Sequence, residues 1–123
     1  MHYNLEIHIQ GDVLIVTAKG NRSLQTIMAM SKEILAACVR DGKKKVICDV
    51  RELKGRLSTL EAFDVPDKYF PKIRDKSVIT HSAIVDLKEY EKSYKFFEDV
   101  AVNRGFVLRI FSNIDEAIEW IGE

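Results

Sequence analysis

Apolar and polar side chains alternate along residues 3–10, which is the period-two pattern of a β-strand with one solvent-facing side. Gly11 and Asp12 follow, and these residue types form tight turns. Residues 13–18 are almost continuously apolar and predict a second, more deeply buried strand. We therefore expect the chain to begin with an antiparallel β-hairpin.

Apolar side chains recur at helical spacing over residues 24–38, which predicts an amphipathic helix. Ser23 is placed to cap its N-terminus, and Gly42 is placed to end it in a left-handed conformation. Residues 46–50 form a short, nearly continuous apolar run. Such a run is typical of a strand in a sheet that is covered on both faces.

Residues 51–77 are the least regular part of the sequence. Ser58-Thr59-Leu60-Glu61 is a capping-box pattern, so a helix is predicted from about residue 58 to residue 64. Pro66 and Pro71 make one long straight helix unfavourable, because proline lacks the amide that a helix interior requires. A kink or a second helical piece through about residue 74 is expected instead.

The C-terminal part predicts strand, helix, strand and helix in that order. Residues 82–86 and 106–111 are the strands, and residues 88–103 are a helix that Gly105 ends. Ser112 or Asn113 caps a final helix, whose inward side chains are Ala117, Trp120 and Ile121. Strands alternating with helices after an initial hairpin indicate a mostly parallel five-stranded sheet covered by helices.

Length and charge narrow the functional classes. The chain has 123 residues and is expected to be one domain over residues 1–123. Nineteen basic residues balance nineteen acidic ones, which argues against a nucleic-acid partner or an anionic membrane surface. No signal-peptide or transmembrane pattern is visible, and Cys38 and Cys48 fall in predicted buried elements without zinc-ligand spacing. We therefore expect a cytoplasmic protein without metal or cofactor.

Several C-terminal segments carry a family resemblance. Asn103-Arg104-Gly105, Arg109-Ile110-Phe111 and the run from Asp115 to Ile121 look like the ending of the SpoIIAA-like subgroup, and Ala83-Ile84-Val85 fits the same pattern. That subgroup of small bacterial domains is related to STAS domains, the fold of anti-sigma-factor antagonists, and to CRAL-TRIO lipid-transfer domains. The resemblance implies a single-domain α/β fold of the STAS-like type with about four helices.

The same resemblance singles out Ser58. Antagonist STAS proteins carry an Asp-Ser-Ser-Gly-like motif after the third strand, where a partner kinase phosphorylates one serine. Ser58 falls at about this phospho-acceptor position, but Leu57 replaces the expected acid and Leu60 the expected glycine. The alternative is that Ser58 only caps its helix, with Glu61 reaching back to the N-cap amide.

Three histidines are candidates for acid–base or metal chemistry. His2 is terminal, and His8 lies on the polar side of the first strand. His81 precedes the fourth strand, whereas ligands in parallel α/β sheets gather at the carboxyl ends of strands. We expect no catalysis from any of them.

Carboxylates form a second candidate group. Asp49 and Asp86 end adjacent parallel strands, with Glu52 just beyond, and paired carboxylates there are a candidate magnesium site of an enzyme. The plainer alternative is that Asp86 begins a helix and Asp49 bonds nearby backbone. We favour the plainer one and expect no enzymatic activity.

Aromatic residues exceed what one helix face can bury, since Phe96 and Phe97 are adjacent and cannot point the same way. Such a surplus fits either the ordinary core or a hydrophobic ligand pocket, dimer contact or partner contact. The candidate pocket residues are Phe63, Tyr69, Phe70, Tyr94 and Phe97.

Charged residues after the third predicted strand form a candidate interaction surface, which consists of Arg51, Glu52, Lys54 and Arg56. It is suited to an acidic partner or a phosphate, with a solvated loop as the alternative. Two functions therefore stay open. The first is a non-enzymatic regulatory module with an unknown protein partner, and the second is a lipid-binding or other hydrophobic-ligand domain. A homodimer is compatible with both.

Overall fold

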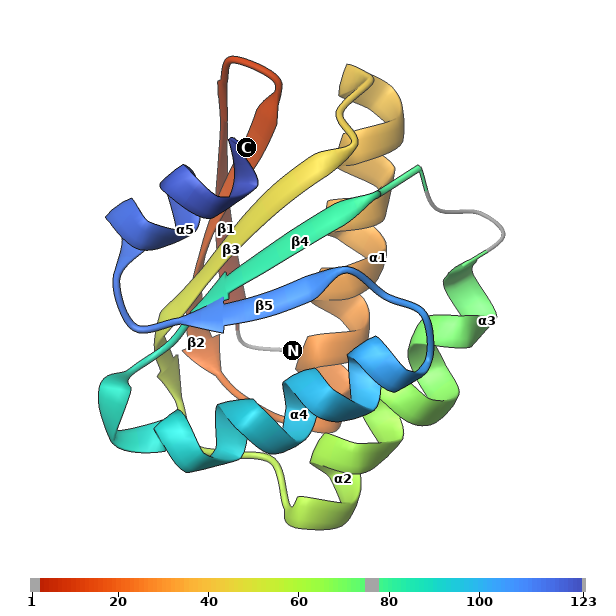
Figure 1. The fold of residues 1–123 in the computed structure, drawn as a ribbon, viewed down its shortest axis with the longest axis vertical. Helices are drawn as coiled ribbons and strands as arrows, with labels where there is room; N and C mark the ends of the chain where they lie inside the picture. The colour runs from red at the N-terminus through yellow and green to blue at the C-terminus, as the bar shows by residue number, and fades with distance from the viewer. Residues whose placement is uncertain (1–2, 75–77, 123) are drawn as a thin grey trace.

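The computed structural model describes residues 3–74 and 78–122. Its centre is a five-stranded sheet in the order β1-β2-β3-β4-β5 (Figure 1). The strands are β1 (Tyr3–Gln10), β2 (Val13–Asn21), β3 (Lys45–Lys54), β4 (His81–Val85) and β5 (Leu108–Phe111). β1 and β2 are antiparallel and every other pair is parallel. The predicted hairpin and mostly parallel sheet are confirmed.

Helices cover both faces of this sheet. One face carries α1 (Leu24–Asp41), the α2–α3 unit and α4 (Glu91–Asn103), and the other carries α5 (Ile114–Ile121). The α2–α3 unit consists of α2 (Thr59–Asp64), the π-helix η1 (Val65–Tyr69) and α3 (Phe70–Arg74), and it packs on α4 (Figure 1). No helix in the described ranges is both long enough and apolar enough to span a bilayer.

The strand period of two divides the core between the faces. Alternate residues of β2, β3 and β4 pack with α5, in a cluster of Val13, Ile15, Ile47, Ala83, Val85, Ala117 and Ile121. The intervening residues face the other way, where Leu14, Val16 and Val46 pack with Ala37 and Cys38 of α1. The sheet is therefore buried on both faces, as its apolar strands predict.

β2 and β3 are longer than the sequence predicts. β2 continues to Asn21 and β3 to Lys54, so Arg51, Glu52 and Lys54 belong to a strand and not to a loop. The extension is stable because the two strands keep pairing, Lys19 with Glu52 and Asn21 with Lys54. A change of register between Thr17 and Lys19 accommodates one extra residue of β3.

The α2–α3 unit confirms the predicted break at the prolines. Pro66 lies at the start of η1, where the amide of Phe70 donates to the carbonyl of Val65 in a wide turn. Pro66 and Pro71 cannot donate in an α-helical ladder, so the chain passes through a π-helical segment between two short α-helices.

The helix caps follow the sequence closely. Ser23 caps α1 by accepting from the amide of Thr26, and Gly42 ends it with a left-handed φ of 66°. Asn113, and not Ser112, caps α5. The predicted helix at residue 88 begins as a 3₁₀ turn, η2 (Lys88–Tyr90), before α4.

Candidate functional site

A cavity of about 550 Å³ is lined by residues of the sheet, α1, the α2–α3 unit and α4. Its volume falls in the range of roughly 300–1,000 Å³ that small-molecule sites occupy. The floor consists of alternate residues from four neighbouring strands: Val16, Ala18, Val46, Cys48, Ile84, Leu108 and Ile110. These are the side chains that point away from α5, so one strand alternation builds both the α5 core and the cavity floor.

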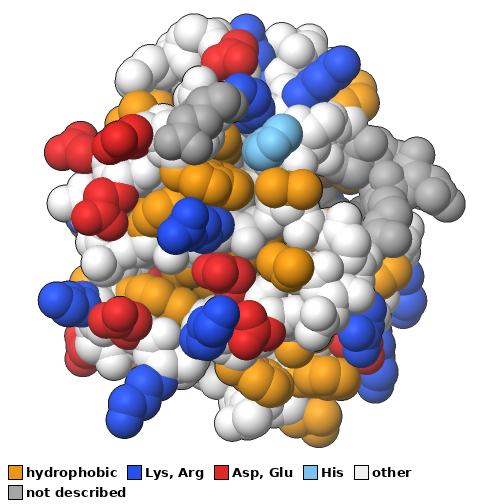
Figure 2. All heavy atoms as spheres, in the orientation of Figure 1, with side chains coloured by type: hydrophobic (Ala, Val, Ile, Leu, Met, Phe, Trp, Pro, Cys, Tyr) orange, Lys and Arg blue, Asp and Glu red, His pale blue; other side chains and the backbone are white. Residues whose placement is uncertain are grey.

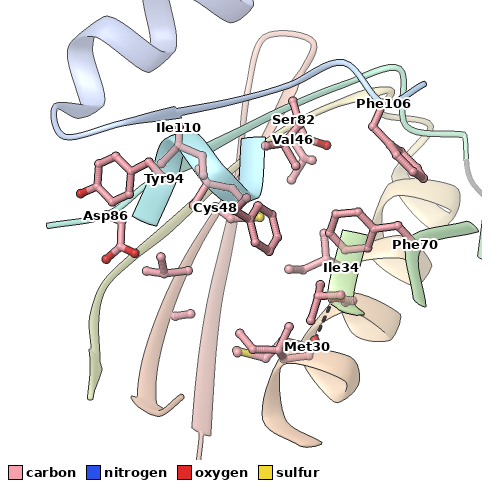
Figure 3. Close-up of a pocket in the computed structure, with 18 of the residues that line it drawn as sticks. Met30, Ile34, Val46, Cys48, Phe70, Ser82, Asp86, Tyr94, Phe106 and Ile110 are labelled. Atoms are coloured by element: carbon pink, nitrogen blue, oxygen red, sulfur yellow. Dashed lines mark hydrogen bonds between the residues drawn. The ribbon is translucent and has the colours of Figure 1, made fainter. Parts of the chain in front are cut away.

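The walls come from three helical elements (Figure 3). α1 contributes Met30 and Ile34, and the α2–α3 unit contributes Phe70. The Phe70 ring meets Phe97 edge-on at a centroid distance of 6.0 Å and Phe106 at 5.4 Å. These rings make one end of the cavity aromatic and apolar.

A buried ion pair lies at the opposite end. Arg22 donates from Nη1 to Asp86 Oδ2 at 2.8 Å and from Nη2 to Asp86 Oδ1 at 3.1 Å. Nη2 also donates to the carbonyl of Val50 at 3.1 Å, and the amide of Leu87 donates to Asp86 Oδ1 at 2.8 Å. The two side chains are only 12% and 9% exposed, so their charges compensate each other away from water.

Arg56 and Tyr94 lie beside this pair. The Arg56 guanidinium carbon is 4.2 Å from the centroid of the Tyr90 ring, and Arg56 also donates to the Ser93 hydroxyl. The Tyr94 hydroxyl is buried and has no hydrogen-bond partner within the described part of the chain. Burial, followed by the nearby charge of Asp86, raises the pKa of Tyr94 to about 12. The phenol therefore remains protonated, and it is an unused hydrogen-bond donor.

Cys48 is the one cysteine that lines the cavity. Burial, with smaller contributions from Cys38 and Asp49, raises the pKa of its thiol to about 12. The group therefore stays a neutral thiol at physiological pH, and it adds apolar surface to the floor.

Three of the five predicted pocket residues line the cavity, namely Phe70, Tyr94 and Phe97. Phe63 and Tyr69 do not belong to its lining. Phe63 instead lies 6.3 Å from the ring of Phe96, and Lys72 sits 5.2 Å above the Tyr69 ring.

The prediction missed the floor of the cavity and the α1 wall, including Met30 and Ile34. The floor could have been predicted from the strand alternation, because every second residue of each strand faces the cavity, at positions 46, 48 and 50 and again at 82, 84 and 86.

The predicted charged surface does not form one cluster around Arg51 and Arg56. The Arg51 guanidinium donates two hydrogen bonds to the Asp49 carboxylate, at 2.9 and 2.8 Å, and the Arg51 amide donates a third at 3.2 Å, whereas Arg56 lines the cavity. Burial raises the pKa of Asp49, but the hydrogen bonds and charge of Arg51 outweigh burial and hold that pKa below its ordinary value. Glu52 is 3.8 Å from Lys19, and Lys54 is exposed.

The candidate carboxylate pair is not assembled. Asp49 pairs in register with Val85, whose side chain belongs to the α5 core. Asp86 is the residue after Val85, so its side chain points to the opposite face of the sheet. Asp86 points into the cavity end while Asp49 lies on the other face with Arg51. Across the described ranges, no three His, Cys, Asp or Glu residues lie close enough to hold a metal ion.

The two histidines that the structure describes, His8 and His81, are not part of the cavity lining. His8 is exposed on β1, and His81 Nδ1 lies 2.9 Å from the Thr80 hydroxyl. His2 falls outside the described residues.

Ser58 forms the capping box that its sequence predicts. Its hydroxyl accepts from the amide of Glu61 at 3.1 Å, and its own amide donates to the Glu61 carboxylate at 3.0 Å. The side chain is exposed at the start of α2. Its expected phosphorylation stays a prediction.

Comparison with known proteins identifies the fold. No family model and no curated protein matches the chain. A solved anti-sigma factor antagonist from Mycobacterium paratuberculosis is similar, with 14% identity over 98% of this chain and 95% of that one and a TM-score of 0.61. An uncharacterized DUF3478-family protein from Shewanella loihica PV-4, described as having a SpoIIAA-like fold, has 18% identity at the same coverages and a TM-score of 0.59. The resemblance predicted from the C-terminal residues is confirmed at the level of the fold, and the chain has a SpoIIAA-like, STAS-type architecture.

Proposed function

We propose that this protein is a binding module that holds a small, largely apolar molecule in the cavity between its sheet and α4. The observation that carries the proposal is the cavity itself, with a volume of about 550 Å³ and walls built from four strands and three helical elements. Protein interiors contain few voids larger than a water molecule. Small-molecule sites are typically concave spaces of this size, lined mainly by apolar side chains with a few polar groups, and the lining of this cavity has that composition.

Native mass spectrometry of the protein purified from cells tests this proposal. We expect the wild type to carry an additional mass that is lost on denaturation. We also expect it to increase the fluorescence of N-phenyl-1-naphthylamine, a neutral apolar probe. The matched control is Ile84→Phe, which places a larger ring on the cavity floor and is expected to lower probe uptake while the fold persists. A ligand-binding role would be contradicted if the wild type carried no additional mass and did not increase the fluorescence of the probe.

A second candidate is a regulatory protein-interaction module. Two observations favour it: one structural neighbour is described as an anti-sigma factor antagonist, and Ser58 is exposed at the start of α2. Hydrophobic side chains also reach the surface near α2 and α4, where Leu60 is 67% and Phe96 42% exposed (Figure 2).

Ser58→Asp and Ser58→Ala separate the two roles of this serine. Aspartate is itself a good N-cap, so Ser58→Asp keeps α2 while adding the negative charge of a phosphate mimic. We expect pull-downs from native lysate to show a partner that binds the wild type and Ser58→Ala but is lost with Ser58→Asp. Equal recovery with all three proteins would leave Ser58 as a helix cap alone.

A further inference from the structure

The cavity has one charged end, and this end indicates what kind of molecule it holds. We infer that the ligand is an amphipathic carboxylic acid, whose carboxylate lies at Arg56 and Tyr94 and whose apolar body extends along the sheet toward Phe70 and Phe106. The inference rests on the proposed function and adds a head-group chemistry and an orientation to it.

The charges in the cavity leave one positive charge unbalanced. Among the residues that the structure describes, three charged side chains line it, namely those of Arg22, Arg56 and Asp86. Arg22 and Asp86 neutralise each other through two hydrogen bonds, so the remaining charge is that of Arg56. A ligand with a single negative charge restores neutrality at this end, whereas a second cation would meet repulsion.

Arg56 is held in place but not neutralised. Its guanidinium stacks on Tyr90 and donates to Ser93, and neither partner carries a negative charge. Within the described part of the chain, no carboxylate lies within ion-pair distance of Arg56. The planar guanidinium is suited to bidentate contact with a carboxylate, and the exposure of Arg56 and Ser93 places this end next to solvent.

Tyr94 supplies a second, independent observation. Its side chain is only 7% exposed and lines the cavity, yet its hydroxyl has no hydrogen-bond partner among the described groups. Buried hydroxyls normally have partners, so an unpaired one at a cavity wall indicates a missing acceptor. Nε of Arg22 is likewise buried without a partner within the same ranges. A carboxylate oxygen is an acceptor of the required kind.

The negative charges near Tyr94 do not oppose this arrangement strongly. Asp86 is already paired with Arg22, and Glu91 is exposed and outside the cavity lining. Burial is the largest cause of the raised pKa of Tyr94, and the charges of Asp86 and Glu91 add to it. The raised pKa keeps the phenol in its donor form.

The far end of the cavity explains why the ligand is amphipathic. Figure 3 shows Asp86 and Tyr94 at one end and Phe70 and Phe106 at the other, with Cys48, Val46 and Ser82 of the sheet between them. Polar groups at one end and aromatic rings at the other match a molecule that has one ionic head and an apolar chain.

Calorimetric titration of two matched probes tests the inference: tetradecanoate and tetradecan-1-ol, below their aggregation concentrations at pH 7.4. They share a chain length and differ in head-group charge. We expect the wild type to bind the acid about tenfold more tightly than the alcohol, since an arginine–carboxylate contact is a strong charge-assisted hydrogen bond. Arg56→Gln should abolish this preference, and Arg56→Lys should retain part of it.

Tyr94→Phe removes only the hydroxyl. We expect it to weaken acid binding several-fold while leaving alcohol binding unchanged. Arg51→Gln is the matched control, because Arg51 lies on the other face with Asp49 and should leave both affinities as in the wild type. Circular dichroism confirms that each variant is folded.

The outcomes separate the two proposals. If acid and alcohol bind the wild type equally, or if Arg56→Gln and Tyr94→Phe both leave the acid preference intact, the head-group assignment is wrong and the apolar binding module remains. If the wild type binds neither probe, nor N-phenyl-1-naphthylamine, the binding module itself is wrong.

Discussion

The two faces of the sheet use the same strands in different ways. On the α5 face, residues of β2, β3 and β4 form one continuous buried cluster with Ala117 and Ile121. On the opposite face, the sheet packs against α1, but toward α4 and the α2–α3 unit the side chains border a cavity of about 550 Å³. One face of the sheet is therefore closely packed, whereas the other borders an open volume.

Small residues have opposite effects on the two faces. Ala83 and Ala117 are both fully buried, and their size allows α5 to lie close against the sheet. Ser82 is also small, but it lines the cavity on the opposite face of the sheet. Residue size thus stabilises a close approach in one place and preserves volume in another.

The largest expected effect compares two strand isoleucines. Ile47 is fully buried in the α5 core, and Ile84 lines the cavity. Ile47→Ala should lower the free energy of unfolding by about 2–5 kcal/mol, because it loses buried surface and creates a new void. Ile84→Ala should cost clearly less, since it only enlarges an existing space. Urea denaturation measures both, and equal losses would show that the cavity is closed in solution.

The next largest expected effect comes from substitutions that enlarge a side chain instead of truncating it. Ala83→Leu inserts volume into the packed face and should destabilise the protein by about 1–3 kcal/mol. Its neighbour Ser82 points into the cavity, so Ser82→Leu should be tolerated and should reduce the uptake of an apolar probe. Thermal unfolding of the two variants is the measurement. A larger loss for Ser82→Leu than for Ala83→Leu would contradict the assigned faces.

Two helix caps give a smaller contrast. Asn113→Ala and Ser58→Ala each remove a capping side chain, which costs about 1 kcal/mol of helix stability. α5 belongs to the core, so the first change should lower global stability. α2 has no fully buried residue, so the second should appear as faster amide hydrogen exchange in α2 while global unfolding changes little. Global destabilisation by both would indicate that the α2–α3 unit unfolds together with the sheet.

The smallest effect depends on pH and concerns the ion pair of the α5 face. The pKa of Asp49 is held below its ordinary value, so its carboxylate stabilises the folded state above the unfolded pKa of about 4 and loses that effect as the pH falls. Asp49→Asn should therefore reduce stability most near neutral pH, with a penalty that shrinks in acid. Glu52→Gln, in an exposed pair, is the control. A penalty that is the same at pH 3 and pH 7 would rule out the Arg51 contact as its source.

Much of the fold is predictable because its signals are local. Strand alternation, the Ser23 and Ser58 caps, the Gly42 stop and the prolines at 66 and 71 all act within a few residues, and the structure agrees with each. The conformation of the C-terminal part of β3 depends instead on a segment that is distant in sequence. Glu52 and Lys54 are residue types that strands disfavour, and they are extended because β2 pairs with them.

The candidate site was harder to predict for the same reason. The aromatic surplus pointed to Phe70, Tyr94 and Phe97, which line the cavity, but it gave no information about which strand residues lie beneath them. The Asp49 and Asp86 hypothesis failed on strand register. Both residues end parallel strands, but a one-residue offset sends them to opposite faces, and register depends on how the connecting segments pack.

The position of Trp120 has a practical consequence for studying this protein in solution. It is the chain's one tryptophan, and it packs on the α5 face, 5.7 Å from the ring of Phe111. The cavity instead contains Tyr90 and Tyr94. Indole emission should therefore follow the melting of the packed face and remain nearly unchanged when a guest enters, whereas tyrosine absorbance should respond to the guest. The two chromophores provide separate optical channels for folding and for occupancy, without any added label.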